Sequence, residues 1–234
     1  MQLKQKELNL HEISDDIKLL FMIELNNHIL LDEKPSIFLN SVLNTKIFKE
    51  YPFNMLGKLK ETEQSPIHHP EGNVWNHTML VVDQAAEQKN KSKDKKVFMW
   101  AALLHDIGKA ETTKNKNGKI TAYNHESVGA DLCVKFLKEF TPDDEFIKKV
   151  KGLVRWHMQI LHVVKDMPFA DIKSMEEETD INEVALLGFC DRMGRTNVDT
   201  EKEMLNIKIF LEKCNKFDYN KNISLVASQY QNIP

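Results

Sequence analysis

An unbroken apolar segment that ends in two adjacent polar residues constrains the fold more than any other feature of the chain. Residues 97–104 read VFMWAALL and run directly into His105 and Asp106, which Gly108 follows closely. A segment that is apolar on every side belongs in a protein core, and Gly108 predicts the end of a helix at this point. Burying an imidazole and a carboxylate beneath such a helix is costly unless a partner satisfies them. A bound metal ion would satisfy both.

Helical periodicity recurs from one end of the chain to the other, whereas the alternating pattern typical of strands is almost absent. Gly and Pro are few, at 8 and 7 of 234 residues. The chain is long enough, and with 41% hydrophobic residues apolar enough, to bury an ordinary core. We therefore predict an all-α fold, a helical bundle.

The first expected helix covers residues 14–31, where apolar residues recur at helical spacing. This spacing predicts that Ile17, Leu20, Phe21 and Leu25 share one buried face.

Capping residues predict the starts of three further helices. Asn73 is a suitable N-cap for the helix that carries His77. Thr141 with Asp144 resembles a capping box, and Asp180 with Glu183 repeats the pattern before the segment that contains Asp191.

A turn and a last helix complete the expected organisation. The pair at residues 117–118, Asn-Gly, predicts a turn or small hairpin that passes over the polar pair. An amphipathic helix is expected over residues 199–217. We predict a helical leader at residues 1–65 that packs on a core domain at 66–217, with a tail at 218–234.

Charge and cysteine content exclude several classes of protein. The formal net charge is −3, so the overall field does not favour nucleic acid, and any RNA contact needs local basic residues. Cys133, Cys190 and Cys214 lie far apart without a CxxC spacing, which argues against disulfides and thiolate zinc sites. No segment resembles an export signal or a membrane span. A cytoplasmic protein is the expectation.

Four residues from three expected helices form a candidate metal-ligand set: His77, His105, Asp106 and Asp191. A single histidine on a helix face is more often structural, but the combination of two imidazoles and two carboxylates suits a divalent ion such as Mn, Fe, Ni, Co, Mg or Zn. His125 and His157 could hold a second ion that shares Asp106, because one carboxylate can bind two cations through its two oxygens. One or two ions are therefore expected.

At this point the sequence resembles a known family, the HD superfamily of metal-dependent phosphohydrolases. It is most similar to the HD portion of bacterial tRNA nucleotidyltransferases, the CCA-adding enzymes. The resemblance is carried by five blocks in the family's order: HHPEGNVWNHTMLVVD at 68–83, LLHDIGKAETT at 103–113, NHESVGADL at 124–132, VRWHM at 154–158 and CDRMGR at 190–195.

The resemblance implies an HD-domain helical bundle and the hydrolysis of phosphate esters. In several members the HD part cleaves 2′,3′-cyclic phosphodiesters, 2′-phosphates or simple phosphomonoesters of nucleotides or RNA ends, by attack of metal-activated water. It implies that Lys109 contacts the phosphate and that Arg195 lines the substrate cleft. Asp106 would orient the attacking water and accept its proton.

The resemblance also has a clear limit. Nothing before Pro66 resembles the polymerase head of those enzymes, so CCA addition is not predicted. Two alternatives stay open: a 5′-nucleotidase, and a non-catalytic module that binds tRNA or a nucleotide or assists a separate nucleotidyltransferase. The lysine-rich residues 89–96 provide a surface for such an RNA contact, although a solvated loop is the simpler interpretation.

Overall fold

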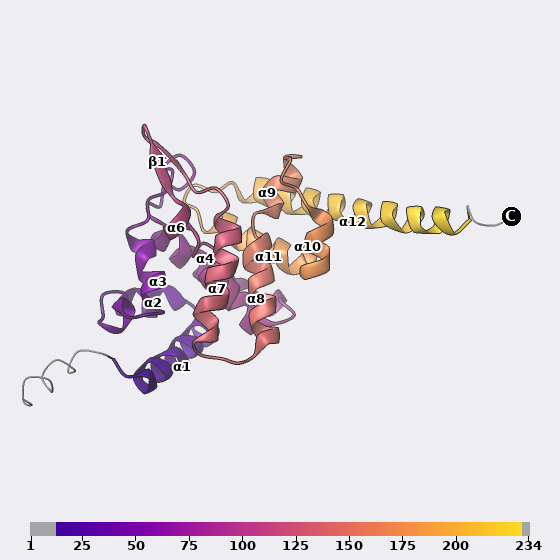
Figure 1. Ribbon diagram of the computed structural model, residues 1–234. Helices are drawn as coiled ribbons and strands as arrows, with labels where there is room; N and C mark the ends of the chain where they lie inside the picture. Colours follow the sequence, from indigo (N-terminus) through magenta and orange to yellow (C-terminus); the bar gives the residue numbers. More distant parts are fainter. Residues whose placement is uncertain (1–12, 231–234) are drawn as a thin grey trace, which may run out of the picture.

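The computed structural model describes residues 13–230, with side chains described as far as residue 217. The first 12 residues of the expected leader and the last four of the expected tail lie outside this range. Within it the chain is all-α apart from one antiparallel hairpin, which confirms the predicted fold class (Figure 1). The helices are α1 Asp15–Leu31, α2 Pro35–Val42, α3 Asn54–Gly57, α4 Val74–Gln88, α5 Lys95–Leu104, α6 Lys109–Thr112, α7 His125–Lys138, α8 Asp144–Trp156, α9 Gln159–Val164, α10 Ile172–Glu178, α11 Ile181–Met193 and α12 Thr200–Tyr230. Short 3-10 turns cover Ile47–Lys49, Lys58–Lys60 and Lys89–Lys91, and the strands are β1 Lys114–Lys116 and β2 Lys119–Thr121.

Helix α5 is the centre of the bundle. All of its residues from Val97 to Leu104 are buried, and the helix contacts α1, α4, α8 and α11. The outer helices pack in pairs around it, α4 with α11 and α7 with α8. Figure 1 shows α7 and α8 side by side. The uniformly apolar segment therefore forms the core helix that its composition predicts.

The N-terminal segment is joined to the core by polar as well as apolar contacts. The indole of Trp75 donates a hydrogen bond to Asn40 (2.9 Å), and that of Trp100 donates one to Asn26 (3.1 Å). Both tryptophans are fully buried, so each indole N–H needs a partner, and the segment before residue 66 provides it. We conclude that this segment completes the core.

The predicted buried face of α1 is only partly right. Phe21 and Leu25 are buried, whereas Ile17 and Leu20 are 52% and 66% exposed. The helix is apolar on more than one side, so the spacing of its apolar residues is compatible with more than one buried face. Packing against α2, α4 and α5 selects the face that also carries Ile29.

Helix starts agree with the capping residues, with one shift. Asn73 and Asp180 accept from backbone N–H groups in the first turns of α4 and α11. The cap of α8, however, is Asp143, which accepts from the N–H of Phe146 at 2.9 Å. Thr141 instead accepts from the N–H of Asp143 (3.2 Å), so the expected capping box is wrong by two residues.

Gly108 permits a close crossing of two backbones, and this is its role in place of the expected helix stop. Helix α5 already ends at Leu104, and Gly108 has an ordinary right-handed φ of −70°. A Cβ atom at this position would lie 2.1 Å from the carbonyl oxygen of His125 and 2.5 Å from the backbone nitrogen of Gly129. The absence of a side chain therefore brings the turn with Asp106 against the first turn of α7.

The hairpin forms at the expected Asn-Gly pair. Asn117 and Gly118 both have positive φ, 52° and 80°, as the commonest two-residue hairpin turn requires. The loop after β2 then leads into α7, and Ile120 and Thr121 line the cavity that contains Asp106. The prediction that this segment passes over the polar pair is thus confirmed.

Helix α12 continues beyond the expected end at residue 217, as far as Tyr230, and Figure 1 shows it extending away from the bundle. Among the described residues, no helix combines the length and the apolar character that crossing a membrane would require.

We predict that Gly108→Ala destabilises the protein by at least about 2 kcal/mol, because the clash is with backbone atoms that cannot rotate away. Urea unfolding followed by circular dichroism measures this change. Gly118→Asn is the matched control, since no atom lies within 4 Å of its Cβ position and asparagine tolerates positive φ. Equal midpoints for the two variants would contradict the proposed crossing.

Candidate metal centre

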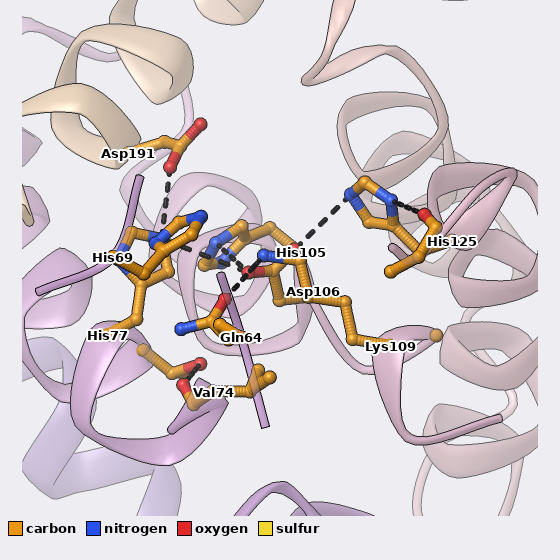
Figure 2. A network of polar contacts seen from close by, with 12 residues as sticks. Gln64, His69, Val74, His77, His105, Asp106, Lys109, His125 and Asp191 are labelled. Atoms are coloured by element: carbon orange, nitrogen blue, oxygen red, sulfur yellow. Dashed lines mark hydrogen bonds and ion pairs between the residues drawn. The ribbon is translucent and has the colours of Figure 1, made fainter. Parts of the chain in front are cut away.

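The carboxylate of Asp106 lies at the centre of the candidate site, with histidines on both sides (Figure 2). Its Oδ2 atom is 3.3 Å from Nε2 of His105 and 3.8 Å from Nε2 of His77. Its Oδ1 atom is 3.4 Å from Nε2 of His125 and 3.8 Å from Nε2 of His157. Each oxygen therefore faces its own pair of imidazoles. We call Asp106 with His77 and His105 the first group, and Asp106 with His125 and His157 the second group.

Three of the four histidines are oriented by their own backbone. In each case Nδ1 lies at hydrogen-bond distance from the carbonyl oxygen three residues earlier, which fixes the proton on Nδ1 and leaves the lone pair of Nε2 for the centre of the site. The pairs are His105 with Ala102 (2.9 Å), His125 with Ala122 (2.8 Å) and His157 with Val154 (2.7 Å).

His77 is oriented by Glu71, a residue that the sequence did not single out. Nδ1 of His77 lies 2.9 Å from Oε1 of Glu71, and Nδ1 of His69 lies 2.8 Å from the same oxygen. The side chain of Glu71 is almost fully buried. A carboxylate in this place fixes the imidazole of His77 with Nε2 pointing inward, as outer partners of metal-binding histidines do.

Asp191 joins the site from the end of α11. Its Oδ1 atom is 3.0 Å from Nε2 of His77. The approach depends on Gly194, because a Cβ atom there would lie 2.5 Å from the side chain of Val81 and 3.0 Å from its backbone nitrogen. The end of α11 can therefore lie directly on α4.

Both carboxylates are held in the ionised form. Burial alone would favour the protonated form of Asp106, but the Lys109 ammonium and the neighbouring His105 hold its pKa well below the usual range. The Arg195 guanidinium likewise overcomes the effect of burial and holds the pKa of Asp191 well below its usual range. Two negative charges thus persist in a buried site.

The histidines of the second group are held neutral, the form in which an imidazole binds a metal. Burial lowers the pKa of His157 to about 3 and also lowers the pKa of His125. For His77 burial acts in the same direction, but hydrogen bonds to Asp191 and Glu71 outweigh it and raise the pKa. The carboxylates around His77 therefore favour a positive charge on its imidazole.

The donor atoms fit a divalent cation. Atoms bound at about 2.1 Å to one ion lie about 3–3.5 Å from one another, and Nε2 of His125 and Nε2 of His157 are 3.2 Å apart. The first and second groups each bring their donor atoms within 4.8 Å. Nε2 of His105 and Oδ2 of Asp106 are buried without a hydrogen bond to any described residue, although Lys109 Nζ lies 2.7 Å from Oδ2. Glu71, His69 and His77 form a third cluster of possible ligands. The contacts of the Glu71 carboxylate with Nδ1 of both histidines explain this cluster without a metal ion.

Two basic side chains reach the same cavity, which has a volume of about 170 Å³. The ammonium of Lys109 is buried and also donates to Gln64 at 2.7 Å. The guanidinium of Arg195 lies 3.7 Å from Asp191 Oδ1. The structure thus brings together the predicted residues His77, His105, Asp106, Lys109, His125, His157, Asp191 and Arg195. Two of their partners were not predicted: Gln64, which precedes the motif blocks, and Glu71, which lies inside the first block but before α4 begins.

Comparison with known proteins defines the class. A family model for the HD domain matches residues 74–193, over half of the chain, and the chain therefore belongs to the HD domain family. As a family, HD domains are metal-dependent phosphohydrolases that bind divalent ions.

Among individual relatives, the chain is similar to the Multifunctional CCA proteins of Halorhodospira halophila (28% identity; 48% of this chain, 26% of the relative) and Hahella chejuensis (33%; 42% and 22%). A third is the Multifunctional CCA protein of Aromatoleum aromaticum (33%; 50% and 27%). The matches confirm the resemblance to the HD portion of CCA-adding enzymes. They cover about a quarter of the length of these relatives.

We predict that Glu71→Gln weakens Mn²⁺ binding about 10-fold or more, because it removes the charge that orients His77. Isothermal titration calorimetry on protein stripped with a chelator measures the affinity. Glu63→Gln is the matched control, since Glu63 lines the same cavity, is exposed and loses the same charge. If both variants bind Mn²⁺ equally well, Glu71 does not orient a ligand.

Proposed function

We propose that this protein is a metal-dependent phosphohydrolase that cleaves nucleotide or RNA-terminal phosphate esters, with 2′,3′-cyclic phosphodiesters and 2′-phosphates as the first candidates. The observation that carries the proposal is the buried Asp106 carboxylate, with two inward-facing imidazoles on each oxygen and two basic side chains in the same cavity.

We further propose which residues hold the metal. His77, His105, Asp106 and Asp191 would hold one ion, and His125 and His157 would hold a second that shares Asp106. A divalent ion bound there supplies acidified water near neutral pH and polarises the phosphate ester. Mn, Ni, Fe, Co, Mg and Zn all remain candidates for a mixed nitrogen and oxygen site.

The chain's own residues would then perform three tasks. The ionised carboxylate of Asp106 would orient the attacking water by accepting a hydrogen bond from it. Lys109 neutralises charge on a phosphate oxygen, and Arg195 can hold two oxygens through parallel N–H donors. Asp106 and Lys109 are buried, which strengthens their electrostatic interactions.

The relatives support a substrate related to RNA ends, because their name refers to the CCA sequence, although the match covers about a quarter of each. The three cysteines are free and buried, which supports a reducing compartment such as the cytoplasm. The same site would also serve a 5′-nucleotidase, and analysis of the products separates the two activities.

Purified protein loaded with Mn, Ni, Co, Mg or Zn should hydrolyse at least one of these substrates: 2′,3′-cyclic nucleotides, 2′-nucleotides or 5′-nucleotides. We expect Asp106→Asn and His105→Ala to lower the rate at least about 100-fold, with reduced metal content by elemental analysis. His28→Ala, on α1, is the control for the loss of a histidine.

Wild type no faster than Asp106→Asn with every metal and substrate would overturn the enzyme proposal. Salt-sensitive tRNA binding that survives Asp106→Asn, without turnover, would instead favour the non-catalytic module.

Lys109→Met should separate catalysis from metal binding. We expect kcat/KM to fall about 10-fold to 100-fold, because a charged hydrogen bond to the phosphate is lost. Mn²⁺ affinity should not fall, since the substitution removes a positive charge 2.7 Å from Asp106 Oδ2. Lys119→Met is the control, because Lys119 is the exposed first residue of strand β2. A parallel loss of Mn²⁺ and activity would assign Lys109 a structural role.

A further inference from the structure

A second groove opens beside the candidate metal centre. It has a volume of about 580 Å³ and lies among the loop before α7, the end of α8, helix α9 and the loop before α10. The cavity of the metal centre, at about 170 Å³, is smaller than the usual pocket for a small molecule, whereas the groove is within that range. A substrate as large as a nucleotide would therefore extend beyond the cavity.

The groove is continuous with the metal centre. Ala122, His125 and Met158 line both spaces. His125, whose Nε2 atom belongs to the second group of ligand candidates, therefore forms part of the wall between the two spaces. The groove is a candidate for binding part of the substrate because it adjoins the metal centre.

Two exposed aromatic side chains line this groove, Tyr123 at 74% and Phe169 at 64% exposure. Large aromatic side chains gain little from such exposure in the free protein. Aromatic rings that border a groove are suited to stack on a nucleobase, because every base has a flat π-face. We call the space bordered by Tyr123, Arg155, His162 and Phe169 the aromatic groove.

The loop that carries Phe169 is held in place by the buried side chain of Gln159. Its Nε2 atom donates to the carbonyl oxygen of Phe169 (3.2 Å), and its Oε1 atom accepts from the N–H of Asp171 (3.0 Å). His162 lies against Phe169, with ring centroids 5.8 Å apart. A fixed aromatic ring is what a binding platform requires, since little order is lost when the ligand binds.

Polar groups in the aromatic groove suit a ribose and base edges. Arg155 lies over the ring of Trp156, 4.6 Å from the ring centroid, and its Nη1 atom is 3.9 Å from Glu126. Glu126 itself is 3.6 Å from Nδ1 of His125, whose closer partner is Ala122 at 2.8 Å. Arg155 and Glu126 thus offer donors and acceptors next to the shared wall.

We propose that the aromatic groove binds the nucleoside next to the reacting phosphate, with the base stacked on Phe169 and Tyr123 while the phosphate lies in the cavity of Asp106. The inference rests on the proposed function and makes it more specific: the substrate class is nucleoside phosphates, and small phosphate esters without a base are poor substrates.

The test compares two cyclic diesters that differ in the nucleoside. Mn²⁺-loaded protein is assayed with 2′,3′-cyclic AMP and with glycerol 1,2-cyclic phosphate, which has the same five-membered ring but no base. We expect Phe169→Ala and Tyr123→Ala each to lower kcat/KM for 2′,3′-cyclic AMP at least about fivefold, mainly through KM. Rates with glycerol 1,2-cyclic phosphate should stay within about twofold of wild type, because its phosphate contacts are retained.

Phe217→Ala is the matched control, because Phe217 is an exposed phenylalanine on α12 that does not line the groove. Equal losses with both diesters, or no loss with 2′,3′-cyclic AMP, would overturn the aromatic groove as a nucleoside site while leaving the hydrolase proposal intact.

A binding measurement keeps the inference testable if no hydrolysis occurs. Calorimetry with Mn²⁺-loaded protein should show adenosine 2′-monophosphate binding at least about fivefold more weakly to Phe169→Ala than to wild type. Inorganic phosphate should bind both proteins equally. Unchanged affinity for the nucleotide in Phe169→Ala and Tyr123→Ala would refute the inference even for an inactive protein.

Discussion

The structure depends on one buried carboxylate. Asp106 is 1% exposed, and an isolated charge at such a depth would cost far more than the stability of a domain. Its ionised form persists because Lys109 contacts one oxygen and four imidazoles surround both. His77 belongs to α4, Lys109 to α6 and His125 to α7. His105 and His157 directly follow α5 and α8. The same residue thus requires the helices to converge and prepares the site to receive a cation.

The helices can converge on Asp106 because glycines allow their backbones to approach closely. The turn with Asp106 crosses α7 at Gly108 and Gly129, and the end of α11 meets α4 at Gly194. Any side chain at the first and last of these positions would push apart the elements that carry the candidate ligands. The close approach places imidazoles from separate helices within 3–4 Å of one carboxylate, so the geometry of the site is set by backbone contacts outside it.

Features set by residues close together in the sequence could be predicted, whereas features set by contacts between distant segments could not. Helix class and most helix starts were predictable, because capping by Asn73 or Asp180 is local. The eight predicted site residues lie together, since each falls within a motif block. Gln64 was missed because only tertiary packing brings it to Lys109. Glu71 lies inside the first motif block, but it precedes α4 and so no helical periodicity pointed to its contact with His77. The exposed Ile17 and Leu20 were misplaced for a related reason: α1 has several apolar faces, and its neighbours select one.

His125 lies on the wall between the metal centre and the aromatic groove and thus links the reaction site to the proposed recognition site. In the arrangement we propose, the imidazole of His125 would bind the metal through Nε2. The same residue also lines the aromatic groove. The reaction would then depend on imidazoles fixed by hydrogen bonds to nearby backbone carbonyl groups, whereas recognition of the base would depend on Tyr123 and Phe169. The loop around Phe169 can change without moving Asp106, because this loop provides none of the contacts of that carboxylate. A site divided in this way can alter its substrate range while it keeps its reaction.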